Sequence, residues 1–174
     1  KAQNVLEDLP IRDVVSWSAL IAGYAQQGQC HTALSCFEQM QNEGLSPDAV
    51  TLTCILNVCG CIGAVDKGIL VHHEIMSKGL LEKHIMLGNA LVDMYAKCGM
   101  LAKTTQVLEE IPIRDVISWS ALIAGYGHQR RGYEALKCFE RMQSEGIAPN
   151  EITFLSVLSA CSRSGLVDEA QRLF

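Results

Sequence analysis

The chain contains a long internal repeat. A shift of 102 residues aligns Lys1–Tyr24 with Lys103–Tyr126, and 35 of the 72 overlapping residues are identical without a gap. Chance does not produce such similarity, so the chain contains duplicated structural units. A duplicated unit has to pack against copies of itself, which restricts the fold to a repeat architecture.

The 102-residue period divides into three units of 35, 36 and 31 residues. Each unit contains two apolar stretches with a break near a glycine, namely Gly28, Gly63, Gly99, Gly132 and Gly165. The resulting segments are residues 1–13, 14–48, 49–84, 85–115, 116–150 and 151–174. We expect the first and last segments to be incomplete units, and the natural N-terminus to be missing.

The apolar stretches are predicted to be helices. In residues 16–26 the apolar side chains follow the i, i+3, i+4, i+7 rule rather than strict alternation: Trp17, Leu20, Ile21 and Tyr24. Residues 31–43 show the same spacing. Gly44 with Pro47, and Gly146 with Pro149, supply stop signals. Acidic residues are expected to open the second helices of two units: Asp66, Asp168 and Glu169.

Such short helix pairs cannot bury their apolar faces alone, but stacked pairs can. The sequence therefore predicts an all-α fold, an α-solenoid of tandem antiparallel helix-turn-helix repeats that form a right-handed superhelix. The composition fits, because 49% of the residues are hydrophobic but only 6% are aromatic. Small residues are expected to allow close helix packing: Ala19, Ala22, Ala121 and Ala124.

Composition also excludes several classes of protein. A chain this apolar, with only 19% charged residues, is not intrinsically disordered. The formal charge of −5 argues against nucleic-acid binding by bulk positive charge, although a local basic stripe is compatible with it. We expect no signal peptide, because no basic start leads into an apolar core. We expect no membrane span, because the charge-free stretches are too short or interrupted.

These units resemble pentatricopeptide repeats of the plant PLS subclass. The resemblance is carried by RDVVSWSALIAGY, GNALVDMYAKCG, EALKCFERMQSEGIAPN and ITFLSVLSACSRSGLVDEA. The order of unit lengths also matches the P, L and S repeats of that subclass. Residues 1–13 then end an S-type repeat, 14–48 and 116–150 are P-type, 49–84 is L-type, 85–115 is S-type, and 151–174 is a truncated L-type repeat.

The resemblance implies binding of single-stranded RNA with one base per repeat. In the family, the base is read by the fifth residue of the first helix and the last residue of the repeat. These positions hold Ser18 with Asp48, Thr53 with His84, Asn89 with Asp115, and Ser120 with Asn150. By the family's code the expected preference is 5'-GNUA-3'. The second base stays open because His84 departs from the usual Asp or Asn.

Two further sets of residues follow from the resemblance. The positions that sandwich the bases are all apolar: Val15, Val50, Met86, Ile117 and Ile152. The basic position that contacts phosphate holds Lys97, His128 and Arg163. Gln26 and Cys61 occupy that position in two other units, so backbone binding is expected to be weak.

Each of these positions also has a purely structural interpretation. Ser18 and Ser120 can be helix surface residues, and Lys97 and Arg163 can be solvated. The last residues of the repeats can be N-caps of the next helix: Asp48, Asp115 and Asn150. Trp17 and Trp119 are assigned to the core rather than to base stacking.

No catalytic site, metal site or cofactor is expected. The eight cysteines include no Cys-x-x-Cys pair, and we expect free thiols in a reducing compartment. His72-His73-Glu74 contains the H-x-E half of the zinc-deaminase signature, but the P-C-x-x-C half is missing. Any deaminase activity is therefore expected in a domain beyond residue 174.

The expected role is the RNA address module of a chloroplast or mitochondrial RNA-processing factor, for which the resemblance favours site-specific C-to-U editing. Its partners would be organellar RNA and possible editing-complex proteins, with no membrane and a monomeric state. Two alternatives stay open. One is a scaffold that binds proteins on its concave surface, and the other is RNA stabilisation or splicing without editing.

Overall fold

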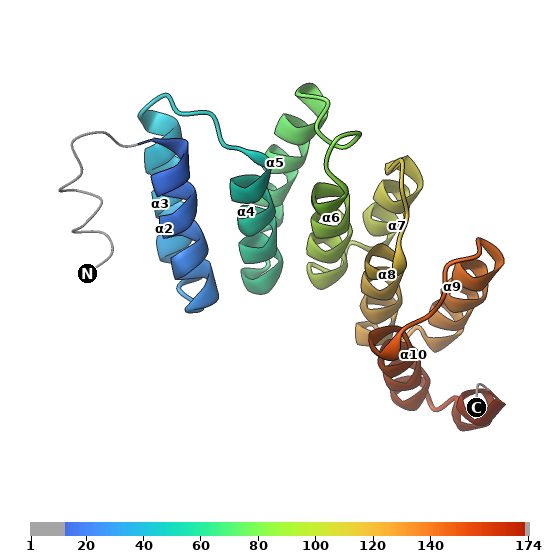
Figure 1. The fold of residues 1–174 in the computed structure, drawn as a ribbon. Coiled ribbons are helices and arrows are strands. Elements are labelled where there is room, and N and C mark those ends of the chain that lie inside the picture. Colours follow the sequence, from blue (N-terminus) through green and yellow to red (C-terminus); the bar gives the residue numbers. More distant parts are fainter. Residues whose placement is uncertain (1–12, 173–174) are drawn as a thin grey trace. The chain divides into compact units, whose positions relative to one another are not determined.

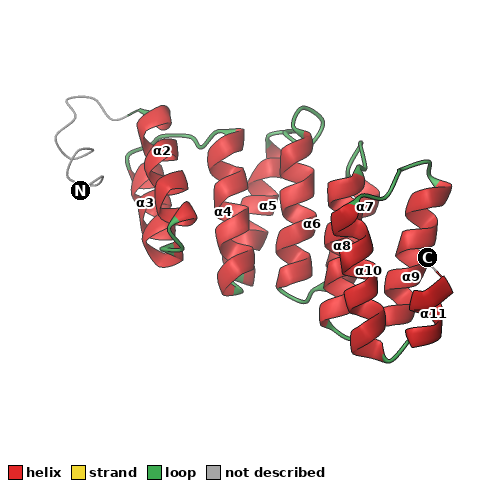
Figure 2. Cartoon of the chain, turned by 60° about the horizontal axis from the view of Figure 1, so that its bottom comes forward, coloured by secondary structure: helices red, strands yellow, loops and turns green. Residues whose placement is uncertain are grey.

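The computed structural model describes residues 13–172. Every regular element in that range is an α-helix (Figures 1 and 2). The helices are α2 Val14–Gln26, α3 Cys30–Asn42, α4 Ala49–Ile62, α5 Val65–Ser77, α6 Ile85–Lys97, α7 Leu101–Glu110, α8 Val116–His128, α9 Gly132–Ser144, α10 Glu151–Ser164 and α11 Val167–Arg172. The predicted end of a repeat at residues 1–13 lies, apart from Asp13, outside the described residues. None of the described helices is long and apolar enough to span a bilayer.

Successive helices form antiparallel pairs, and the pairs stack. The chain divides into two compact units, Lys1–Leu80 and Leu81–Phe174. In the first unit, α2 packs against α3 and α4. In the second unit, α8 packs against α6, α7, α9 and α10, so that each first helix contacts the first helix of the next pair. The predicted all-α helical-repeat fold is confirmed.

The expected helical spacing accounts for the core. Trp17 and Ile21 of α2 are buried against α3, whose Ala33, Phe37 and Met40 are also buried. Trp119 is fully buried at the equivalent position of α8. The assignment of both tryptophans to the core is therefore correct. Asp66 lies in the first turn of α5, and Asp168 and Glu169 lie in that of α11, as predicted.

One predicted turn residue is misplaced. Gly28, Gly63, Gly99 and Gly165 have positive φ between two helices, but Gly132 is the first residue of α9. The left-handed residue of that turn is Arg130, with φ of 57°. Arg130, rather than Gly132, aligns with Gly28 in the 102-residue shift.

Glycines make close contacts between helices, while the predicted role of the alanines stays a prediction. Ala19 is exposed, and Ala22, Ala121 and Ala124 are only half-buried. A Cβ on Gly125 would lie 2.9 Å from the Cβ of Ala96, and one on Gly132 would lie 2.7 Å from Oγ of Ser164. The absence of a side chain therefore lets neighbouring pairs approach at these points.

Candidate nucleic-acid interface

The side chain of the last residue of a segment caps the following helix in four cases, at Asp13 and at three of the predicted base-reading residues. Asp48 Oδ1 accepts from the Thr51 amide at 2.8 Å. Asp115 Oδ1 accepts from the Ser118 amide, and Asn150 Oδ1 from the Thr153 amide, both at 3.0 Å. The N-cap interpretation is thus confirmed, but the cap uses only one of the two terminal atoms of each side chain. The second terminal atom, Oδ2 of the aspartates or Nδ2 of Asn150, is not used by the cap and can form a hydrogen bond with another group.

Asn89 and Asp115 contact each other directly. Asn89 Nδ2 donates to Asp115 Oδ2 at 2.9 Å, while Asp115 Oδ1 caps α8. Asn89 is only 8% exposed, and its Oδ1 is buried with no hydrogen-bond partner among the described residues. A buried carbonyl oxygen without a donor is energetically costly, which makes it a ready acceptor for an incoming N–H group.

The two serines at the equivalent position are linked to their partners by a threonine. Ser120 Oγ lies 2.8 Å from Thr153 Oγ1, which donates to Asn150 Oδ1 at 3.0 Å. Ser18 Oγ likewise hydrogen-bonds to Thr51 Oγ1, and Thr51 Oγ1 donates to Asp48 Oδ1 at 2.7 Å.

The serines are buried, so their interpretation as helix surface residues is wrong. Sequence reasoning also missed the threonines, although Thr51 and Thr153 are identical in the 102-residue alignment.

Thr53 and His84 lie in different units. Thr53 Oγ1 donates to the Ala49 carbonyl at 2.7 Å within the first unit. His84 precedes α6 in the second unit and makes no side-chain cap there. Their predicted pairing stays a prediction.

Apolar side chains are exposed at the second residue of every first helix. Val15 is 72% exposed and Ile152 64%, and Val50, Met86 and Ile117 are also exposed. In the second unit, Ile117 and Ile152 line a pocket of about 240 Å³ together with Ser120 and Asn150. The structure thus brings four of the predicted site residues into one pocket, whose lining is mostly apolar and also includes Asp93 and Ser156.

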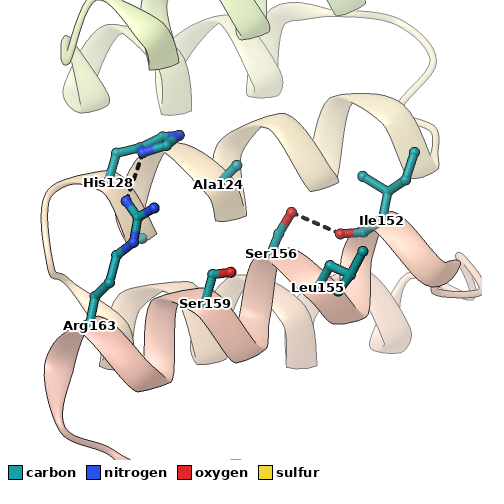
Figure 3. Close-up of a pocket in the computed structure, with 8 residues that line it drawn as sticks. Ala124, His128, Ile152, Leu155, Ser156, Ser159 and Arg163 are labelled. Atoms are coloured by element: carbon teal, nitrogen blue, oxygen red, sulfur yellow. Dashed lines mark hydrogen bonds between the residues drawn. The ribbon is translucent and has the colours of Figure 1, made fainter.

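The three predicted basic residues are exposed in the last turns of first helices, and Figure 3 shows two of them, His128 and Arg163. Arg163 Nη1 lies 2.9 Å from His128 Nδ1, and the guanidinium, which has no acceptor, is the donor of this contact. Both side chains line a second pocket of about 180 Å³ that also contains Ile152. Lys97 forms an ion pair with Asp93 at 2.7 Å.

The remaining polar clusters offer no metal site. No group of three or more His, Cys, Asp or Glu side chains comes together between residues 13 and 172. All eight cysteines are free thiols, and burial raises the pKa of Cys138 to about 11. His72, in the H-x-E sequence, is buried in α5.

These features define a helical-repeat protein that exposes one face of its first helices. A family model described as "PPR repeat family" matches residues 12–61 and 114–163, and one described as "PPR repeat" matches residues 89–116. Together they cover more than half of the chain, which therefore belongs to the pentatricopeptide repeat (PPR) family.

Similar proteins come from plants. A mitochondrial pentatricopeptide repeat-containing protein of Arabidopsis thaliana is 41% identical over 98% of this chain and 27% of its own length. The chloroplastic protein CRR2 of the same plant is 42% identical over 99% of this chain and 26% of its own length. The chain thus spans about a quarter of these relatives.

Solved structures share the fold. Maize PPR10, in complex with an 18-nt psaJ RNA element, superposes with a TM-score of 0.83 at 20% identity, over 99% of this chain and 26% of that chain. The PPR domain of Arabidopsis thaliana protein-only RNase P 1, in complex with tRNA, gives a TM-score of 0.65 at 12% identity, over 88% of this chain and 83% of that chain.

Proposed function

We propose that the chain binds single-stranded RNA and reads one base with each complete helix pair. The pocket formed by Ile117, Ile152, Ser120 and Asn150 carries this proposal. The two exposed isoleucines can sandwich a base, while Ser120 and Asn150 form hydrogen bonds with its edge. The RNA-bound structures of maize PPR10 and the RNase P domain support the proposal, since they share this fold.

The repeats would be residues 14–48, 49–84, 85–115 and 116–150, followed by part of another in 151–174. This proposal rests on the helix starts, because α2, α4, α6, α8 and α10 begin at the first residues of these segments. The unit lengths of 35, 36 and 31 residues further support an assignment to the PLS subclass.

The proposed preference is 5'-GNUA-3'. Asp48 offers an acceptor, which suits the N–H donors of guanine. The unpartnered Oδ1 of Asn89 suits the N3–H of uracil. Asn150 uses its Oδ1 in the helix cap, so its Nδ2 is available to donate to N1 of adenine.

In the whole protein, the proposed role is to address an organellar transcript, with site-specific C-to-U editing as the leading process. The names of the mitochondrial and chloroplastic relatives favour an organelle. Only three predicted phosphate-contacting residues are present, so the chain alone should bind RNA weakly. Three or four stacked bases supply roughly 1–3 kcal/mol each before association costs.

The base assignment can be tested by exchanging the last residue of one repeat. We expect Asn150→Asp to move the preference at the fourth base from A toward G, because the exposed donor becomes an acceptor. Fluorescence anisotropy with short RNAs that carry GNUA or GNUG measures this preference for both proteins.

Asp48→Asn is the matched control in the first unit. It should relax the preference for G at the first base and leave the fourth base unaffected. Unchanged base preferences in both variants would contradict the assignment of the reading residues. If the unmodified chain binds an unrelated peptide library as strongly as it binds RNA, the protein scaffold is favoured instead.

A further inference from the structure

The threonine at the third residue of a following helix lies between the two proposed base-reading residues. In the second unit, Thr153 is fully buried and contacts both Ser120 and Asn150. It does not line the pocket, so any effect on a bound base is indirect. We propose that Thr153 is a positioning residue that fixes the hydrogen-bond polarity of the pocket, and that Thr51 does the same in the first unit. This inference rests on the proposed function.

The direction of each hydrogen bond follows from counting protons. Thr153 has one hydroxyl proton, which it donates to Asn150 Oδ1. Its oxygen can then only accept, so the proton of the short Ser120–Thr153 contact belongs to Ser120. Ser120 therefore turns lone pairs, not a proton, toward the pocket.

Asn150 is oriented by the same contacts. Its Oδ1 accepts from both the amide and the hydroxyl of Thr153, at 3.0 Å each. The Nδ2 group is thereby left as the end that faces outward. The pocket consequently presents a donor at Asn150 and an acceptor at Ser120, which matches the N1 acceptor and N6 donor of adenine.

In the first unit the same threonine contacts act on an aspartate instead of an asparagine. Asp48 is an acceptor only, so Thr51 must donate its proton to Asp48 Oδ1. The single Ser18 hydroxyl proton is shared between Thr51 Oγ1 and the Val14 carbonyl, which both lie within hydrogen-bonding distance of Ser18 Oγ. Both proposed reading groups of that repeat therefore offer acceptors, which favours the N–H-rich edge of guanine.

In the second unit, the repeat with Asn89 and Asp115 lacks such a link through a hydroxyl group. Ser118 occupies the same third position, but its hydroxyl donates to the Asp115 main-chain carbonyl at 3.0 Å. The longer Asn89 side chain reaches Asp115 without an intermediary. We call the hydrogen bonds that run from the serine through the threonine to the last residue of the repeat the hydroxyl relay. Among the described repeats, it occurs in the two that have a serine at the fifth residue.

The test removes the hydroxyl without changing the shape of the side chain. Thr153→Val should reduce the preference for GNUA over GNUG about fivefold, the effect of one hydrogen bond. Thr153→Ser should retain the preference, and Ser118→Ala should leave the preference at the third base unchanged. Anisotropy gives the ratio of affinities, and circular dichroism checks the fold. If Thr153→Val fails to fold, Thr51→Val tests the same contacts in the first unit and should reduce the preference for G at the first base.

Two failures can be told apart. If Asn150→Asp switches the preference but Thr153→Val leaves it unchanged, the relay is wrong and the proposed function stands. If neither the unmodified chain nor Asn150→Asp shows a preference at the fourth base, the proposed base reading fails and the relay fails with it.

Discussion

At the turn between α8 and α9, an arginine occupies a backbone position that glycine takes in the equivalent turn. Arg130 has φ of 57°, while Gly28 has φ of 71° at the aligned position. A side chain in the left-handed region costs about 1–2 kcal/mol. Arg130 is exposed, and its position is therefore a local source of strain rather than a packing requirement.

Replacing this arginine should stabilise the chain. We expect Arg130→Gly to raise the free energy of unfolding by roughly 0.5–1 kcal/mol, because relief of strain exceeds the added entropy of the unfolded chain. Urea denaturation measures the change. The opposite substitution, Gly28→Ala, should lower stability by a similar amount; a loss of stability in Arg130→Gly would argue against strain at this turn.

Among the elements, contact between neighbouring helix pairs depends on missing side chains. Gly127 lies against Ala160 of α10, where an added Cβ would be 3.0 Å from the alanine Cβ. Gly132 has Ser164 and Leu166 at 2.7–2.8 Å from the same point. These glycines set how closely α8 and α9 approach the following pair.

Adding one methyl group at this contact should be destabilising. We expect Gly132→Ala to cost about 1–3 kcal/mol, because Ser164 and Leu166 have to shift. Cys30→Ala is the matched control, since Cys30 is the aligned first residue of α3, and should change stability by no more than about 0.5 kcal/mol. Thermal melting of both variants compares them, and equal melting temperatures would show that the interface can relax.

At the scale of the whole molecule, the net charge of −5 must be reconciled with binding to a polyanion. Many basic residues are engaged in ion pairs away from the exposed first-helix positions. Arg141 of α9 pairs with Glu109 of α7, for example, and hydrogen bonding to Arg141 lowers the pKa of the Glu109 carboxyl. Arg163 and His128 are the predicted phosphate-contacting residues that lie together.

The salt dependence of RNA binding should therefore be shallow. Each phosphate that the protein neutralises adds about 0.7 to the slope of log Kd against log salt concentration. With one or two such phosphates, log Kd should change by roughly 1 for a tenfold change in salt concentration. Arg163→Gln should flatten this slope, while Lys137→Gln, an equal change of charge on α9, should not. A slope several times steeper would mean that other basic residues contact the RNA.

The sequence by itself determined the repeat, the helix pairs and the capping positions. These features depend on local spacing, such as the separation of three positions from Asn150 to Thr153. The apolar position at Val15 and its equivalents was predicted from the resemblance to pentatricopeptide repeats, and the structure shows that it is exposed. The roles of Thr51 and Thr153 could not be predicted, because each contacts a serine 33 residues earlier in the chain.

Only the tertiary structure decided which partners equivalent groups use. Trp17 Nε1 donates to Glu43 at 2.9 Å, whereas Trp119 Nε1 has no described hydrogen-bond partner, although Glu145 is aligned with Glu43. Arg141 stands where the first unit has Gln39; it binds Glu145 at 3.1 Å and lies over the Trp119 ring. Glu145 also accepts from Arg114 Nε at 3.0 Å. A guanidinium attracts a carboxylate more strongly than an indole N–H does, so the two arginines take the place that the indole has at Glu43.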